Sequence, residues 1–477
     1  MKRLLYTFFA CWLLLACQPE KKTSVDLLIT GATIVDVKSG ELIQERALVI
    51  SADTIQAIIN ASEANTYQAK EVITAPGKFL IPGLWDMHVH FGDDTLIQEN
   101  KNLLPLYVAH GITAVRDAAA DISPSVLEWR KAINQGKLLG PKVFTAGPKI
   151  EGINSVWPGD LEVGTEEEML QAMDSLEKIQ VDFVKITDNT LSPELFVTAV
   201  KEARKRHLPV SGHIPFSVPL GELSDAGLSS VEHLSYLLKA GSKRDKEISD
   251  LYAAKKLSFW VAREEINESF DKEYALNVYR KLAENQTAVV PTINMTYTFA
   301  NWDKHNPTQD DYLKYLGGGL IKTYAGRVKS LEGATREDFD KRREQYAKTS
   351  ALLPLLQKAG VNIIAGTDAG FLNSYVYPGI GLHTEIELYV NAGLTPLQAL
   401  QAATINGTRY FGNSDRYGSI EKGKSADILI LNTNPLHDIK ATRDIQTVIM
   451  RGTVFNREAL DSLLEKVESL AVETKNQ

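Results

Sequence analysis

The chain has 477 residues, of which 44% are hydrophobic, and its formal net charge at pH 7 is −8. A chain of this length can bury a large core, and α/β barrels commonly use such lengths as one main domain. Because the charge is negative and no basic cluster is interleaved with aromatic residues, nucleic acid is excluded as an expected partner.

The N-terminus has the pattern of an export signal. Two basic residues precede an apolar run at 4–15, which is too short to span a bilayer but suits the core of a signal peptide. The run ends in Leu14-Leu15-Ala16-Cys17, which resembles the lipobox of bacterial lipoproteins, where the cysteine is lipidated. We expect a signal peptide at 1–17, lipidation of Cys17 and a polar tether at 18–24. An ordinary secretory signal or membrane anchor is the alternative.

The same segment sets the expected location and redox chemistry. Gln18 follows the cysteine where inner-membrane lipoproteins carry Asp, which favours an outer-membrane lipoprotein that faces the periplasm. The only other cysteine is Cys11. If cleavage precedes Cys17, no thiol is left for a disulfide, a cysteine metal site or a cysteine nucleophile.

A small β unit is predicted on both sides of a larger central part. Short β-rich runs at 26–30, 33–37, 46–50, 54–59 and 71–74 predict the first part of a β-sandwich, over 25–81. Runs at 427–431 and 447–451 predict its second part, over 416–457. Leucines at helical spacing then predict a C-terminal packing helix within 458–477.

Residues 82–415 alternate between β-rich and helical patterns. The eight β-rich runs lie at 83–91, 112–118, 142–146, 183–187, 209–213, 230–233, 288–293 and 362–367. Eight such alternations predict an α/β fold, a (β/α)8 TIM barrel. A doubly wound sheet is the alternative, but it needs a glycine-rich phosphate turn after its first strand, where this chain has two histidines.

Two long segments, 239–286 and 296–349, exceed a minimal barrel. They are charged and aromatic, and the second contains Gly317-Gly318-Gly319, a hinge candidate. We interpret most of these residues as helical additions with solvated faces, while loops of this length beside a barrel mouth also serve as lids.

The candidate chemistry gathers at the ends of the predicted strands, where the active site of a barrel lies. In Asp86-Met87-His88-Val89-His90, two histidines at i and i+2 share one face of strand one, so both can reach one metal ion. The predicted strands four, five, six and eight end at Lys185, His213, His233 and Asp368. All these side chains are metal ligands or can become so. Asp86 is expected to anchor the backbone, and Arg116 with Asp117 to form a structural ion pair.

These motifs together resemble the amidohydrolase superfamily, over nearly all of the chain after the signal. The similar segments are the Pro-Gly-x-x-Asp-x-His-x-His opening at 82–90, 111–117, Glu232-His233, Gly366-Thr367-Asp368-Ala369 and 418–427. The resemblance is strongest to the branch with prolidase-like dipeptidases, acyl-amino-acid hydrolases and imidazolonepropionase-like proteins.

The resemblance implies a binuclear centre of the carboxylated-lysine type. Lys185 would be carboxylated by carbon dioxide, and the carbamate would bridge two divalent ions, for which zinc is expected. The implied ligands are His88, His90 and Asp368 for the more buried ion, and His213 and His233 for the other. A bridging hydroxide would be the nucleophile, and Asp368 would carry its proton to the leaving group.

The resemblance further implies hydrolysis of an amide bond in a small-molecule substrate, a dipeptide or an N-acyl amino acid. The loop after strand three lacks the glycine-rich segment with a histidine that the dipeptidases tend to carry, so specificity for Xaa-Pro dipeptides does not follow. The candidate substrate contacts are Asn154, Trp157, Tyr297 and His383. The sequence leaves the oligomeric state open.

Two other functions remain open at this point. Mononuclear deaminases and cyclic-amide hydrolases of the superfamily typically lack the strand-four lysine and use an acid two or three residues after the strand-five histidine. This chain has Lys185 at the end of predicted strand four, and it has Pro215 and Phe216, which are not acids, two and three residues after His213. A barrel that has lost catalysis and serves as a binding scaffold would lack at least one metal-ligating residue, and none of the six predicted here is missing.

Overall fold

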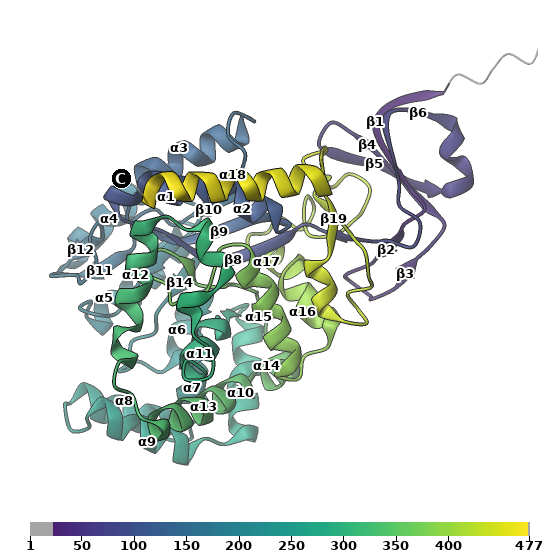
Figure 1. The fold of residues 1–477 in the computed structure, drawn as a ribbon. Helices are drawn as coiled ribbons and strands as arrows, with labels where there is room; N and C mark the ends of the chain where they lie inside the picture. The colour runs from purple at the N-terminus through teal and green to yellow at the C-terminus, as the bar shows by residue number, and fades with distance from the viewer. Residues whose placement is uncertain (1–21, 476–477) are drawn as a thin grey trace, which may run out of the picture.

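The computed structural model describes residues 22–475, which form a barrel with a two-sheet β unit on one side (Figure 1). The expected signal peptide, Cys17 and most of the tether lie outside the described residues. Among the described residues, no helix has both the length and the apolar character needed to cross a membrane.

The β unit consists of a four-stranded and a six-stranded sheet. The first contains β1 (Thr23–Thr30), β4 (Arg46–Ser51), β5 (Thr54–Asn60) and β6 (Tyr67–Thr74), with the short helix η1 (Ala61–Thr66). The second contains β2 (Thr33–Val35), β3 (Leu42–Ile43), β7 (Phe79–Pro82), β18 (Ile428–Leu431), β19 (Ile445–Met450) and β20 (Thr453–Asn456). β18 pairs antiparallel with β7. Segments before and after the barrel therefore build one sheet, as the sequence predicts, while the exact domain limits stay predictions.

The barrel strands are parallel and occur in the predicted order. They are β8 (Leu84–Phe91), β9 (Ile112–Ala120), β10 (Lys142–Thr145), β13 (Val184–Ile186), β14 (Val210–Gly212), β15 (Ser230–Glu232) and β16 (Ala288–Val290). Two short strands follow β10 in the chain, β11 (Ile150–Gly152) and β12 (Leu161–Val163). They pair with each other, and β11 also pairs with β13. The amide of Asp182 donates to the Thr145 carbonyl over 2.9 Å and joins the two halves of the barrel.

The eighth position closes the barrel without a regular strand. The amide of Ile364 donates to Val289 and that of Met87 to Ala365, both over 2.9 Å, so the segment bridges β16 and β8. Only β17 (Ala369–Gly370) is a regular strand here, instead of the predicted 362–367. Asp368, between this segment and β17, has a positive φ angle of 63°, which interrupts the extended backbone there.

Helices cover the outside of the barrel. They are α1 (Ile97–Asn102), α2 (Leu104–Ala109), α3 (Ser123–Asn134), α4 (Glu166–Lys178), α5 (Pro193–Lys205), α6 (Leu220–Ala226), α14 (Leu353–Ala359), α15 (Ile380–Asn391), α16 (Pro396–Ala402) and α17 (Ile405–Tyr410). Thr404, whose ψ of −93° is not helical, separates α16 from α17. The C-terminal helix α18 (Arg457–Lys475) packs along α2, as expected of a packing helix (Figure 1).

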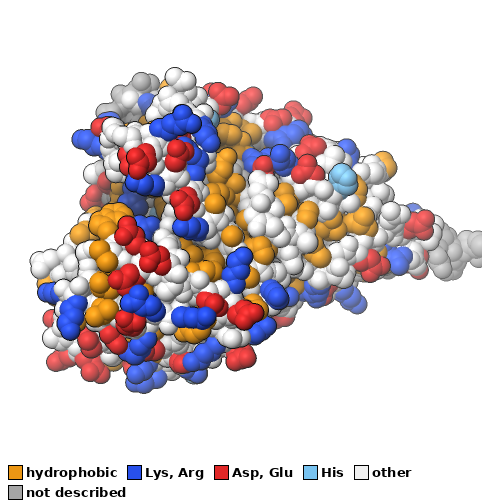
Figure 2. All heavy atoms as spheres, turned by 90° about the horizontal axis from the view of Figure 1, so that it is seen from below, with side chains coloured by type: hydrophobic (Ala, Val, Ile, Leu, Met, Phe, Trp, Pro, Cys, Tyr) orange, Lys and Arg blue, Asp and Glu red, His pale blue; other side chains and the backbone are white. Residues whose placement is uncertain are grey.

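The two long segments are helical. The first contains α7 (Tyr236–Ala240), α8 (Asp245–Ala253), α9 (Phe259–Ser269) and α10 (Lys272–Glu284), and the second α11 (Ile293–Ala300), α12 (Gly318–Val328) and α13 (Arg336–Ser350). Three short helices lie within the second segment: η3 (Pro307–Gln309) and η4 (Asp311–Tyr315) between α11 and α12, and η5 (Lys329–Leu331) between α12 and α13. Viewed from the side of α8, α9 and α13, hydrophobic side chains lie among acidic and basic ones (Figure 2).

The glycine triplet at 317–319 fits a packing role better than the expected hinge. The carboxylate of Glu99 accepts hydrogen bonds from the amides of Gly319 and Leu320, over 3.0 and 2.9 Å, at the start of α12. A Cβ atom on Gly319 would lie 2.1 Å from a methyl group of Leu96. The glycines therefore allow close approach of α1 to α12.

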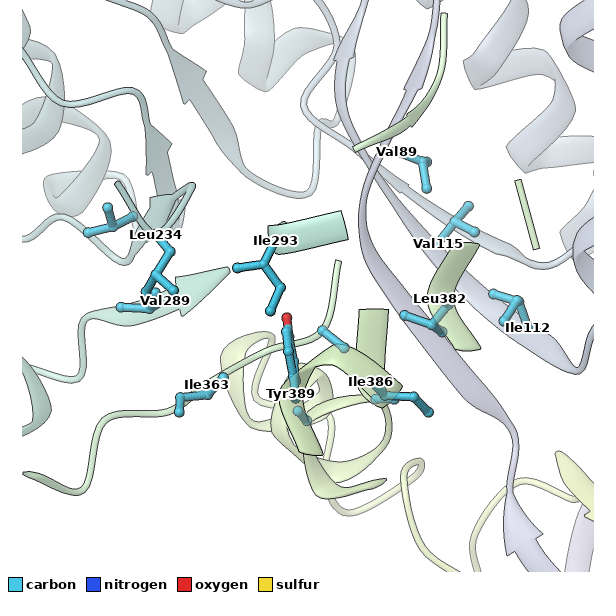
Figure 3. Close-up of a cluster of buried hydrophobic side chains, with 14 of the residues drawn as sticks. Val89, Ile112, Val115, Leu234, Val289, Ile293, Ile363, Leu382, Ile386 and Tyr389 are labelled. Atoms are coloured by element: carbon cyan, nitrogen blue, oxygen red, sulfur yellow. The ribbon is translucent and has the colours of Figure 1, made fainter. Parts of the chain in front are cut away.

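One hydrophobic core connects the strands with the helices behind them. Leu382, Ile386 and Tyr389 of α15 lie close to side chains from β8, β9 and β16 (Figure 3). These residues are fully buried, or nearly so. The packed interior holds the strand ends in place at the rim.

Candidate metal centre

Three metal-type ligand atoms converge near the end of β8 and just before the start of β17. The Nε2 atoms of His88 and His90 lie 3.2 Å apart, and Oδ1 of Asp368 lies 3.2 Å from the first and 2.9 Å from the second. His88 is buried, whereas His90 is partly exposed. Two imidazole nitrogens and a carboxylate oxygen form a ligand set that suits a divalent ion such as zinc.

A second pair of histidines lies beside this cluster. His213 and His233 follow β14 and β15, and their Nε2 atoms are 3.0 Å apart. The ring centroids of His233 and His88 are 5.2 Å apart. The strand ends thus bring together all the histidines that the sequence analysis assigned to the rim.

Lys185 comes from the middle of β13 and is almost completely buried. Its Nζ atom has no hydrogen-bond partner among the described residues. Burial lowers the pKa of Lys185 to about 8, against the opposing effect of the Glu232 carboxylate. A buried ammonium without a partner is costly, so this orphaned amine fits conversion to an anionic carbamate between two cations.

Glu232, which the sequence analysis did not single out as a site residue, orients His88. Its Oε2 atom accepts hydrogen bonds of 2.6 Å from Nδ1 of His88 and from the Arg116 guanidinium. Although burial raises the pKa of Glu232, Arg116 and His88 hold it well below its usual range. Because Nδ1 of His88 donates to this carboxylate, the free lone pair of the ring is on Nε2 and faces the cluster.

The contact between Arg116 and Glu232 also corrects an expectation. The predicted ion pair between Arg116 and Asp117 is wrong, because successive residues on a strand point to opposite faces. Asp117 instead accepts a hydrogen bond of 2.8 Å from the hydroxyl of Thr145. Asp86 anchors the backbone as expected, because it accepts from the amide and hydroxyl of Thr367 over 3.0 and 2.7 Å.

Thr292, at the end of the seventh strand, orients His233. Its hydroxyl donates to the Pro291 carbonyl over 2.9 Å and lies 2.7 Å from Nδ1 of His233. The hydroxyl has one proton, so it must accept from Nδ1, which leaves Nε2 of His233 unprotonated and facing His213. The sequence analysis missed Thr292, and the only signal was its place at a strand end.

The rim opens into a cavity of about 970 Å³. Its walls include five of the six predicted ligands, namely His90, Lys185, His213, His233 and Asp368. Of the four predicted substrate contacts, Trp157 lines the cavity.

The other three predicted contacts lie elsewhere. Asn154 and Tyr297 are exposed and do not belong to the cavity wall, although the ring of Tyr297 lies 5.5 Å from that of Tyr346, which does line the cavity. His383 is buried, and its ring nitrogens bond the Thr442 hydroxyl and the His110 carbonyl, both over 2.9 Å. The structure therefore does not bring Asn154, Tyr297 or His383 to the site, because α11 and α15 turn the latter two side chains away from it.

Known proteins resemble this chain over most of its length. The ochratoxinase of Aspergillus niger is 26% identical over 91% of this chain and 86% of its own length. Among solved structures, bottromycin amidohydrolase aligns with a TM-score of 0.71 and 19% identity over 93% of this chain and 90% of that one. A Xaa-Pro dipeptidase with bound methionine aligns with a TM-score of 0.64 and 21% identity over 90% of this chain and 99% of that one. These structures share the fold.

A family model extends this similarity across the barrel. The model of the Amidohydrolase family matches residues 79–455, which include every barrel strand and nearly all of the second part of the β unit. Because this match covers most of the chain, the protein belongs to the amidohydrolase family and is a hydrolase that acts on carbon–nitrogen bonds.

Proposed function

We propose that the protein is a binuclear, metal-dependent hydrolase that cleaves the amide bond of a dipeptide or an N-acyl amino acid. The observation that carries this proposal is the meeting of two ligand clusters at one rim, with the unpartnered amine of Lys185 beside them. A single cluster would suffice for a mononuclear hydrolase, and a scaffold protein would need neither.

Each residue has a role in this proposal. His88, His90 and Asp368 would hold one ion, His213 and His233 the other, and carboxylated Lys185 would bridge them. When bound, two zinc ions would polarise the scissile carbonyl and make water ionise near neutral pH. The carbamate is an anionic oxygen ligand, whereas a lysine ammonium would be repelled by two cations.

In this proposal, Asp368 would move the proton. Burial raises its pKa, but hydrogen bonds from His88 and His90 hold the pKa of Asp368 well below its usual range. The side chain is therefore ionised at neutral pH, as a proton acceptor must be, and it would take the proton of the attacking water and pass it to the leaving nitrogen, which must be protonated to depart as an amine.

The cavity suits a small substrate. Its volume of about 970 Å³ lies at the upper end of the usual range for small-molecule sites. Trp157 contributes an aromatic wall, with the ammonium of Lys149 at 5.8 Å from the ring. An aromatic face beside charged groups favours a ligand with both apolar and charged parts.

The experiment combines metal content with turnover. We expect purified, zinc-loaded protein to contain about two ions per chain and to hydrolyse members of a library of dipeptides and N-acyl amino acids. A chelator should abolish hydrolysis, and added zinc should restore it. A content of about one ion per chain with deaminase activity would support the mononuclear alternative, and full metal loading without any turnover would support the scaffold.

Export as an outer-membrane lipoprotein is a separate proposal that rests on the sequence pattern ending in Cys17. Expressed with its leader in a bacterial host, the protein should incorporate labelled palmitate and sediment with outer membranes. Cys17→Ser should abolish both results, and labelling of that variant would contradict the proposal.

A further inference from the structure

The segment 239–286 contributes a wall to the cavity above the metal centre. Trp260 and Arg263 of α9 line the same cavity as His213 and Asp368. Trp260 is 70% exposed, although it is a large aromatic residue. An exposed aromatic side chain beside an arginine in a catalytic cavity points to ligand contact rather than to core packing.

Aromatic contacts connect Arg263 to the rim. Its guanidinium carbon lies 5.7 Å from the ring centroid of Phe259 and 5.5 Å from that of Trp260. The ring of Phe259 lies 5.5 Å from that of Phe216, which follows His213 by three residues. Phe259 thus lies between Arg263 and the loop after His213, which is a predicted metal ligand.

Arg263 has no anionic partner within the protein. Among residues 22–475, no hydrogen bond or ion pair reaches its guanidinium, and the adjacent Glu264, which also lines the cavity, does not pair with it. Burial lowers the pKa of Arg263, and no neighbouring carboxylate acts against this effect. By contrast, Arg244 of the same segment pairs with Glu247 over 2.7 Å and with Glu265 over 3.1 Å.

Since no group among residues 22–475 pairs with the guanidinium of Arg263, its N–H donors are available to a ligand. Contact with aromatic rings uses the face of a guanidinium, whereas its N–H donors lie in the plane and match the two oxygens of a carboxylate. Arg327 and Arg342 also line the cavity, but both are exposed, so water weakens their attraction for an anion. Arg263 is partly buried and is therefore the best placed of the three.

Building on the proposed amide hydrolysis, we propose that Arg263 binds a carboxylate of the substrate. The substrates are then acidic amides, such as N-acyl amino acids and peptides with a free C-terminal carboxylate. Neutral and cyclic amides, which lack this group, would be poor substrates.

The test uses substrate pairs that differ only in the carboxylate. N-acetyl-L-phenylalanine is paired with N-acetyl-2-phenylethylamine, and N-acetyl-L-leucine with N-acetyl-3-methylbutylamine. Zinc-loaded wild type and Arg263→Gln are compared by steady-state kinetics and, separately, by calorimetric binding. For the acids, Arg263→Gln should raise KM and Kd about tenfold or more with little change in kcat, and the neutral analogues should not respond.

Two control variants make the result specific. Arg263→Lys keeps the charge but not the paired donors, so it should lie between wild type and Arg263→Gln. Arg244→Gln removes a paired arginine from the same segment and should leave the preference for acids unchanged.

Each outcome bears on one proposal. Three results would overturn the carboxylate subsite. Arg263→Gln could affect the acids and the neutral analogues equally, Arg342→Gln could have the larger effect on the acids, or the wild type could bind neither acid. Arg263-dependent binding of the acids without hydrolysis would keep the subsite and refute the proposed reaction.

Discussion

Thr292 shows how one hydroxyl group can set the direction of a ligand-type histidine. Its φ angle of 47° is rare for a β-branched residue, because the branched Cβ crowds the backbone in this region. Such a conformation persists only where the surroundings impose it. Here it directs the hydroxyl toward Nδ1 of His233, so the strained backbone and the orientation of the ring belong together.

Thr292→Val keeps the branched shape and removes the acceptor for His233. We expect zinc affinity to fall about tenfold to a hundredfold, because the ring loses the contact that selects its tautomer. Competition with a chromogenic chelator measures this loss. Thr292→Ser should retain most of the affinity, and Thr298→Val in the helix that follows, α11, should have no effect. Wild-type affinity in Thr292→Val would contradict the role of the hydroxyl.

At the scale of elements, buried glutamates attach the second long segment to the barrel. Glu385 of α15 accepts from the amides of Ile293 and Asn294 over 2.8 and 2.7 Å, at the first turn of α11. Glu99 of α1 does the same for α12. The first amides of a helix lack partners within the helix, and the oxygens of each glutamate supply them, so each glutamate fixes one helix of the cavity wall.

Close packing of α12 on α1 can be tested with two glycines of one helix. Gly319→Ala would place a Cβ 2.1 Å from Leu96 and 2.9 Å from Glu99, so we expect a loss of about 1–3 kcal/mol in the free energy of unfolding. Gly326→Ala meets no atom within 4 Å and should be neutral or stabilise by about 0.5–1 kcal/mol. Denaturant unfolding measures both, and equal effects would exclude the packing role.

Glu385 predicts a pH dependence of stability. Burial raises its pKa from 4.5 to about 8, although the amides of Asn294 and Ile293 act in the opposite direction. Between these values the folded state keeps a proton that the unfolded state releases, so this contribution to stability is lost as pH rises through the window. Glu385→Gln should flatten the slope of Tm against pH, while Glu387→Gln on the same helix should not. An unchanged slope in Glu385→Gln would contradict this assignment.

At the scale of the whole molecule, the barrel and its rim could be predicted from the sequence. The order of β-rich runs is a local signal, and parallel strands place their ends on one side, so His213 and His233 could be expected near His88 and His90. Glu232 and Thr292 could not be assigned their roles, because those depend on contacts between strands far apart in the sequence. His383 was misplaced because a position after a strand does not determine where a helix directs its side chain.

The anomalous diffraction of zinc-loaded crystals tests the binuclear centre most directly. We predict two peaks about 3.5–4 Å apart, one bounded by His88, His90 and Asp368 and the other by His213 and His233. Extra density on Nζ of Lys185 should connect them as a carbamate. A single peak, peaks away from these residues, or an unmodified lysine between two ions would contradict the account.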